Sequence, residues 1–131
     1  MILDTSAVIA ILRSEPEAEK IAIAIEQAIH RRISAVSYVE AAAVIDGGHD
    51  PIAIRRFDDL LREAEVTIEP VSENQALIAR AAYRDFGKGS GHPARLNFGD
   101  CFAYALAKSR KEPLLFKEDD FNHTDVKAAL S

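Results

Sequence analysis

The sequence predicts an α/β fold, a three-layer α/β/α domain in which helices cover both faces of a mainly parallel sheet. Short apolar runs alternate with longer amphipathic segments along the 131 residues, and this alternation is typical of parallel strands joined by helices. A chain of this length is expected to form a single domain over residues 1–131. Its apolar share of 48% is enough to fill a core.

Four short runs are the expected strands, and they lie at residues 1–3, 33–36, 66–68 and 113–116. The first and the last are apolar throughout, as strands buried on both faces of a sheet are. The third alternates apolar and polar residues and ends before Pro70, which indicates an edge strand. The sheet therefore has four strands, or five if the last residues of the chain add another.

Helices are predicted from apolar residues that recur with helical spacing and from the residues at helix ends. Ser37 and Glu40 have the spacing of a capping box, so one helix is expected to begin at Ser37 and to stop at the glycines 47 and 48. Ser72 and Asn97 are the expected N-caps of two later helices. The expected helices cover residues 5–12, 17–29, 37–46, 51–64, 72–86 and 97–110, and a last short one begins at Thr124.

Composition excludes several classes of protein. No apolar stretch reaches the roughly 20 residues that a membrane-spanning helix needs, and the first residues lack the pattern of a signal peptide. We therefore expect a cytoplasmic protein without a membrane-spanning segment. Cys101 is the only cysteine, which excludes an internal disulfide and a cysteine-based zinc site, and we expect it to be a small buried side chain.

Acidic residues recur where strand-like runs give way to a helix or a loop. They are Asp4, Glu40, Asp100 and the adjacent pair Asp119 and Asp120. Because the carboxyl ends of parallel strands share one edge of an open sheet, these side chains are predicted to converge there. A cluster of carboxylates repels itself unless a hard cation occupies it. The pattern therefore favours a metal-dependent phosphodiester chemistry.

Each of these acids also has a purely structural explanation. Asp4 could be the N-cap of the helix that follows it, and Glu40 could complete a capping box with Ser37. Asp100 lies three residues after Asn97, where an acid also favours the positive end of a helix. The adjacent acidic pair that comes last could be a solvated turn. The two roles are compatible, because a helix N-terminus keeps a carboxylate ionised and so able to bind a cation.

Taken in order, these segments resemble the PIN-domain ribonucleases, and within them the VapC-type toxins of bacterial type II toxin–antitoxin pairs. The resemblance covers nearly the whole chain and implies a single domain with the PIN-like fold. The matching stretches are Ile-Leu-Asp-Thr-Ser-Ala, Ser-Tyr-Val-Glu, Arg-Leu-Asn-Phe-Gly-Asp-Cys and Pro-Leu-Leu-Phe-Lys-Glu-Asp-Asp-Phe.

The resemblance implies a catalytic site of four acids. Asp4, Glu40 and Asp100 match the first three, and the fourth is Asp120 when the chain is aligned on the phenylalanine that follows it. Asp119 is the alternative, and Glu118 then stands where many members of the family have an aspartate.

Further roles follow from the same resemblance. Ser6 matches a small hydroxyl residue that orients a ligand carboxylate or a bound water. Asp4 and Asp100 would bind Mg²⁺ or Mn²⁺ directly. Glu40 and Asp120 would bind a second ion or position water, and the implied reaction is endonucleolytic hydrolysis of RNA by metal-activated water.

The implied RNA substrate requires basic contacts. The densest basic stretch surrounds a glycine-rich loop, although a solvated surface explains it about equally well. The formal net charge of −5 weighs only weakly against RNA, because five acids belong to the predicted site and the remaining charges balance. The candidate RNA contacts are Lys88, His92, Arg95 and Lys117.

The resemblance also implies partners. Members of this family are inhibited by a cognate VapB-type antitoxin, and they usually form homodimers. A basic inhibitory segment would be attracted to an acidic site.

Two other functions remain open. A phospho-accepting receiver domain has a similar length and fold class, but it needs an acceptor aspartate at the end of a central strand near mid-chain. Asp46 and Asp50 follow a helical pattern instead. The closer alternative is a catalytically inactive PIN-like module that only binds a partner, and the unpaired acids argue against it.

Overall fold

A computed structural model describes residues 1–130. Its central sheet has the strand order β3-β2-β1-β4, and all neighbouring strands are parallel. The predicted parallel sheet and the predicted edge strand are therefore confirmed. Leu114 also forms an isolated bridge with Ala128, but no fifth strand forms within the described residues. The strands are β1 (Ile2–Leu3), β2 (Arg32–Ser34), β3 (Thr67–Glu69) and β4 (Leu114–Leu115).

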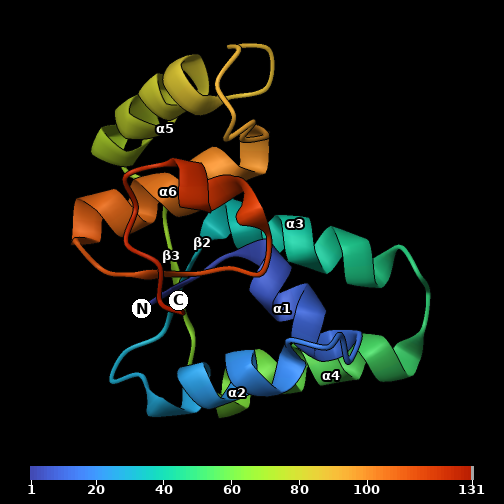
Figure 1. Cartoon of the computed structure of the whole chain (residues 1–131). Coiled ribbons are helices and arrows are strands. Elements are labelled where there is room, and N and C mark those ends of the chain that lie inside the picture. The colour runs from blue at the N-terminus through green and yellow to red at the C-terminus, as the bar shows by residue number, and fades with distance from the viewer. Residues whose placement is uncertain (131) are drawn as a thin grey trace.

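Helices cover both faces of the sheet, as predicted. In Figure 1, α5 and α6 lie on one side of the strands, and α1, α2 and α4 lie on the other. Among residues 1–130, none of the helices is both long and apolar enough to cross a membrane. The helices are α1 (Thr5–Leu12), α2 (Ala18–Gln27), α3 (Ala35–Asp46), α4 (Pro51–Glu63), α5 (Glu73–Phe86), α6 (Phe98–Arg110) and the short 3₁₀ helix η1 (Asp119–His123).

The strands divide the core into two parts because successive side chains of a strand point to opposite faces. Ile2 and Leu114 pack with α5 and α6, whereas Leu3 and Leu115 pack with α1 to α4. All four are at most 1% exposed, and full burial of such side chains contributes about 1.5–3 kcal/mol each. Cys101 is buried on the α6 side, and burial raises the pKa of its thiol to about 12, so it remains a protonated core residue as expected.

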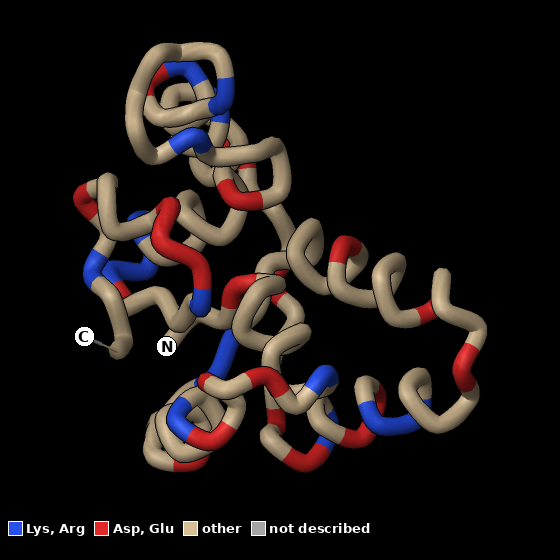
Figure 2. The backbone as a smooth tube through the Cα atoms, turned by 45° about the vertical axis from the view of Figure 1, so that its right-hand side comes forward, with Lys and Arg blue, Asp and Glu red and all other residues tan. Residues whose placement is uncertain are grey.

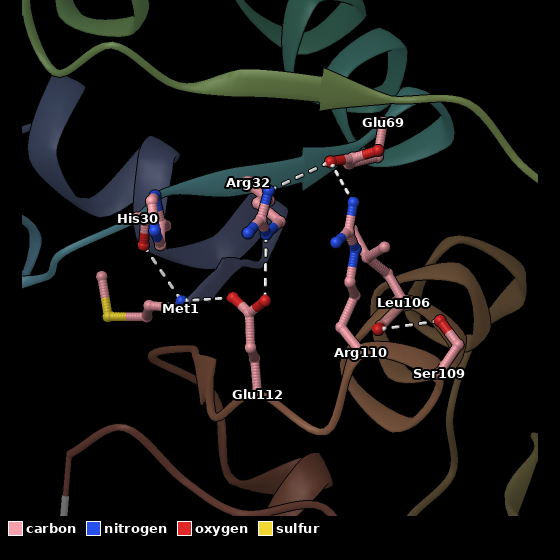
Figure 3. A network of polar contacts seen from close by, with 8 residues as sticks. All are labelled: Met1, His30, Arg32, Glu69, Leu106, Ser109, Arg110 and Glu112. Carbon is pink, nitrogen blue, oxygen red and sulfur yellow. Dashed lines mark hydrogen bonds and ion pairs between the residues drawn. The ribbon is translucent and has the colours of Figure 1, made fainter.

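Ion pairs connect the strands away from the predicted acidic cluster (Figure 3). Glu112 accepts from the Met1 amino group at 2.6 Å and from Arg32 Nε at 3.0 Å. Glu69 Oε1 is 3.3 Å from Arg32 Nη1 and 2.8 Å from Arg110 Nη2. These ion pairs connect β2, β3, the end of α6 and the segments that lead into β1 and β4.

The start of α3 differs from the prediction. The helix begins at Ala35, and Ser34 is its N-cap, because the Ser34 hydroxyl accepts a hydrogen bond from Val36 N–H at 3.3 Å. Ser37 is fully buried inside the helix, so the expected capping box of Ser37 and Glu40 is wrong. The serine at the end of β2 already occupies the capping position, three residues earlier.

The ends of α2 and of the chain also differ. α2 stops at Gln27, and Ile29 is 88% exposed, so the helix expected over residues 17–29 is shorter at both ends. The helix expected from Thr124 is absent from residues 124–130. The short helix η1 ends just before this segment, at His123. The N-caps Ser72 and Asn97, the bounds of α1 and the stop at Gly47 are confirmed.

Candidate active site

Asp4 lies at the centre of the candidate site because β1 is an inner strand of the sheet. It is the N-cap of α1, and its Oδ2 accepts a hydrogen bond from Ser6 N–H at 3.0 Å. The residue is only 3% exposed, and its second oxygen, Oδ1, is buried without a hydrogen-bond partner among the described residues. An ionised oxygen in that state is costly unless a cation approaches it.

Ser6 connects this carboxylate to the end of β4. Its hydroxyl oxygen accepts a hydrogen bond from Lys117 N–H at 3.0 Å, and the hydrogen bonding of Ser6 to Asp4 lowers the pKa of that carboxyl. Burial acts in the opposite direction and dominates, so the pKa of Asp4 is raised to about 6. The negative charges of Glu40 and Glu118 raise it further.

Glu40 reaches the site from the second turn of α3. Its Oε1 accepts a hydrogen bond from Thr5 Oγ1 at 2.7 Å. Its Oε2 packs so closely on Gly99 that a Cβ at that position would lie 2.2 Å away. Any larger residue at position 99 would therefore displace the carboxylate, and this requirement for glycine was missed by the sequence argument.

Asp100 has the capping role considered for it, and it also lines the cavity of the candidate site. Asn97 Oδ1 accepts from Asp100 N–H at 2.9 Å, and Asp100 Oδ2 accepts from Asn97 N–H at 3.0 Å, which completes a capping box. Burial raises the pKa of Asp100 to about 7 against the lowering effect of the Asn97 hydrogen bond, and Asp4, Glu40 and Asp120 raise it further. Asp100 follows a loop rather than a strand, so it reaches the site through the N-terminus of α6.

The two candidates for the fourth acid have different surroundings. Asp119 accepts a hydrogen bond from Asn122 Nδ2 at 3.0 Å and lies 3.0 Å from His123 Nε2, and its side chain is 77% exposed. Asp120 is half-buried and close enough to Asp100 to raise the pKa of that residue. Asp119 therefore stabilises the η1 turn, whereas Asp120 is the candidate whose charge acts on another site acid.

A cavity of about 290 Å³ joins the first three predicted acids, and neither Asp119 nor Asp120 is among its lining residues. Asp4, Glu40 and Asp100 line it together with Glu118, which stands where many members of the family have an aspartate, and with two charged residues that the sequence did not single out, Arg13 and Glu15. The three predicted acids are thus brought together, although Glu40 and Asp100 come from helices and not from the ends of strands.

The donor set fits a divalent cation. Carboxylate oxygens are the preferred ligands of Mg²⁺ and Mn²⁺, and the unpartnered Oδ1 of buried Asp4 is suited to bind one. Within residues 1–130, no three acidic, histidine or cysteine side chains already converge closely enough to chelate an ion. An ion would therefore draw the carboxylates inward or bind some of them through water, as Mg²⁺ usually does.

Comparison with known proteins shows the family of this chain. The sequence model of the PIN domain family matches residues 1–127. Ribonuclease VapC28 of Mycobacterium tuberculosis is 58% identical over 130 residues, which cover 99% of this chain and 98% of the relative. Ribonuclease VapC42 of the same species is 47% identical over the full length of both chains. The chain therefore belongs to the PIN domain family, and within that family to the VapC group.

Solved structures with low sequence identity share the fold. Mycobacterium tuberculosis VapC20, described as a sarcin–ricin loop cleaving toxin, superimposes with a TM-score of 0.74 at 14% identity and covers 95% of each chain. A chain of a toxin–antitoxin complex from Klebsiella pneumoniae has a TM-score of 0.69 at 18% identity and covers 92% of this chain and 88% of that chain. These matches confirm the predicted PIN-like architecture.

The raised pKa of Asp4 predicts a pH-dependent stability of the metal-free protein. Because the folded-state pKa of about 6 lies above the ordinary 3.8, the folded state holds a proton that the unfolded chain has lost, and stability falls as pH rises from about 4 to above 6. Asp4→Asn keeps an N-cap and removes this titration. Urea unfolding in EDTA should show the variant gaining about 3 kcal/mol on the wild type across that range.

Mg²⁺ should cancel this gain by stabilising the wild type alone at neutral pH. A free-energy difference between the two proteins that stays constant from pH 4 to 8 would contradict the unfavourable burial of Asp4.

The contact between Glu40 and Gly99 predicts a second effect. Gly99→Ala should displace the Glu40 carboxylate and weaken Mn²⁺ binding, measured by calorimetry, by roughly tenfold or more, as changes beside metal ligands do. Gly48→Ala is the matched control, because a Cβ there would meet only Ile45 O at 3.5 Å, an ordinary contact. Equal Mn²⁺ affinity in both variants would show that Glu40 does not contribute to the ion site.

Proposed function

We propose that this protein is a VapC-type toxin, a metal-dependent endoribonuclease that hydrolyses phosphodiester bonds of RNA. The observation that carries the proposal is the convergence of Asp4, Glu40 and Asp100 on one cavity, with a buried Asp4 oxygen that lacks a partner. Membership of the VapC group supports the reaction class. The same membership speaks against a receiver domain, and the cluster of acids speaks against a module that only binds a partner.

The residues divide the chemical work between them. Asp4 and Asp100 would hold a Mg²⁺ or Mn²⁺ ion, which when bound lowers the pKa of water and offsets charge on the phosphate. Ser6 orients the Asp4 carboxylate. Glu40, held by Thr5, and Asp120 would orient the attacking water or accept its proton. No histidine or cysteine nucleophile is required for this reaction.

The loop between α5 and α6 is the proposed contact for the RNA backbone. Lys88, His92 and Arg95 line an open cavity of about 720 Å³ there, and Figure 2 shows that basic residues recur on this loop. The loop ends at Asn97, on the rim of the acidic cavity, so a strand bound to the loop could continue into the site. Lys117, in the acidic cavity itself, is a further candidate contact.

We further infer a VapB-type antitoxin as the partner that inhibits the site. The carboxylates of the cavity would attract a basic segment of such a partner, as they would a metal ion. The proposal includes a single PIN domain over the whole chain, a homodimer as in related toxins, and a cytoplasmic location, where the RNA substrate is found.

Removal of the proposed ligands predicts loss of cleavage. Asp4→Asn and Asp100→Asn should each lower the cleavage rate of a mixed pool of structured RNA at least about a hundredfold, since a bound ion contributes several kcal/mol to such reactions. The wild type should cut with Mg²⁺ or Mn²⁺ and not with EDTA. Asp50→Asn is the control, because Asp50 caps α4 and does not line the cavity.

The same assay separates the two candidates for the fourth acid. Asp120→Asn should lower the rate strongly, whereas Asp119→Asn should change it only slightly, because Asp119 is engaged by Asn122 and His123. A larger loss in Asp119→Asn would reverse the assignment. Cleavage that survives in EDTA would contradict the metal-dependent mechanism.

A further inference from the structure

Two basic side chains line the acidic cavity, and their surroundings differ. Lys117 and Arg13 both line it together with Asp4 and Asp100. A polyanionic substrate is repelled by a cluster of carboxylates, so a basic side chain inside the cavity is the group that would hold a phosphate near the acids. Which of the two side chains can make that contact depends on the acidic partners that each already has.

Lys117 already forms an ion pair with an acidic residue. Its Nζ lies 3.0 Å from Glu15 Oε2, and the hydrogen bond to Glu15, with the nearby charges of Glu15, Glu17 and Glu118, raises the pKa of Lys117. To bind a phosphate, this lysine would have to give up the Glu15 pair and remain beside the other two acids. The gain from a phosphate contact is reduced by that loss.

Arg13 forms no ion pair with the residues that the structure describes. Within residues 1–130, no carboxylate lies within ion-pair distance of its guanidinium, whereas Lys117 in the same cavity is paired. The side chain is exposed, so its charge is accessible from solvent. A guanidinium can form two parallel hydrogen bonds to a phosphate, which an ammonium cannot do.

The backbone holds Arg13 in place. Arg13 is the C-cap of α1, and the helix ends in a Schellman motif, in which Glu15 N–H bonds Ala10 O at 2.9 Å and Ser14 N–H bonds Ile11 O at 3.1 Å. Ser14 takes the left-handed conformation with φ of 50° that this motif requires. The turn therefore presents Arg13 and Glu15 to the cavity from one fixed segment.

We propose that Arg13 binds a phosphate group of the RNA substrate inside the acidic cavity and is the main substrate cation there, ahead of Lys117. This inference rests on the proposed ribonuclease function and names the group that brings RNA to it. The short α1 helix connects the two roles, because Asp4 caps its first turn and Arg13 ends its last.

The test compares Arg13→Gln, Arg13→Lys and Lys117→Gln with the wild type. Cleavage of the structured RNA pool with Mg²⁺ and binding of the same pool, labelled with fluorescein, are measured over a series of salt concentrations. Arg13→Gln should weaken binding and raise KM roughly tenfold to a hundredfold, the loss of a charge-assisted contact. Its slope of log affinity against log salt should become shallower by about one.

The other variants should separate charge from geometry. Arg13→Lys should recover part of the loss, since it restores the charge without the guanidinium fork, and Lys117→Gln should lose less than Arg13→Gln. Mn²⁺ affinity should be the same in the wild type and Arg13→Gln, since the residue carries no proposed ion ligand. Arg55→Gln, an exposed arginine on α4 outside the cavity, is the control for lost charge.

The outcomes distinguish this inference from the function on which it rests. Wild-type binding, KM and salt slope in Arg13→Gln, or a larger loss in Lys117→Gln, would overturn the role of Arg13 and leave the nuclease intact. A wild type that binds the pool without cutting it would overturn the nuclease, and the binding losses would still decide the role of Arg13. A wild type that does neither would overturn both.

Discussion

The burial of one carboxylate, that of Asp4, is the constraint on which the candidate site depends. Strand pairing on both sides of β1 and the N-cap bond to Ser6 N–H leave it no freedom to turn toward solvent. In the metal-free protein its charge is unfavourable, and Glu40 and Glu118 make it more so. A bound cation relieves the same interaction that the fold creates. The proposed affinity for metal and the predicted pH dependence of stability therefore have one physical origin.

Local signals were sufficient to predict much of the fold. Ser72 and Asn97 each bond a backbone N–H three residues ahead, so the sequence next to each helix start contained the information. The spacing rule for capping residues failed at Ser37 and Glu40. These two residues have the spacing of a capping box, but they do not form one. Glu40 accepts its hydrogen bond from Thr5, 35 residues away. The N-cap of α3 is instead Ser34, at the end of β2. A capping box cannot be read from spacing when a tertiary contact engages the acid.

Two features of the site that the sequence could not predict depend on distant contacts. The acids of the site could be selected as candidates by residue type and order. The contact between the Glu40 carboxylate and Gly99, however, requires α3 and α6 to be packed together. The pairing of Lys117 with Glu15 spans 102 residues, and it changes which cation is available in the cavity. Arg13 gave no motif at all, because the turn after α1 has a serine, Ser14, in the left-handed conformation where a glycine would have marked the turn.

The charges of the cavity make opposite demands on its two kinds of proposed ligand. A metal ion or a basic antitoxin segment is attracted by the acids alone, whereas RNA is repelled by them and needs a cation in the same space. A metal ion held by Asp4 and Asp100, as proposed, would offset part of this repulsion. Arg13 supplies a second positive charge at the other end of α1, without neutralising the ligands. One helix of eight residues thus carries at its two ends the proposed ligand of a cation, Asp4, and the proposed ligand of a phosphate, Arg13.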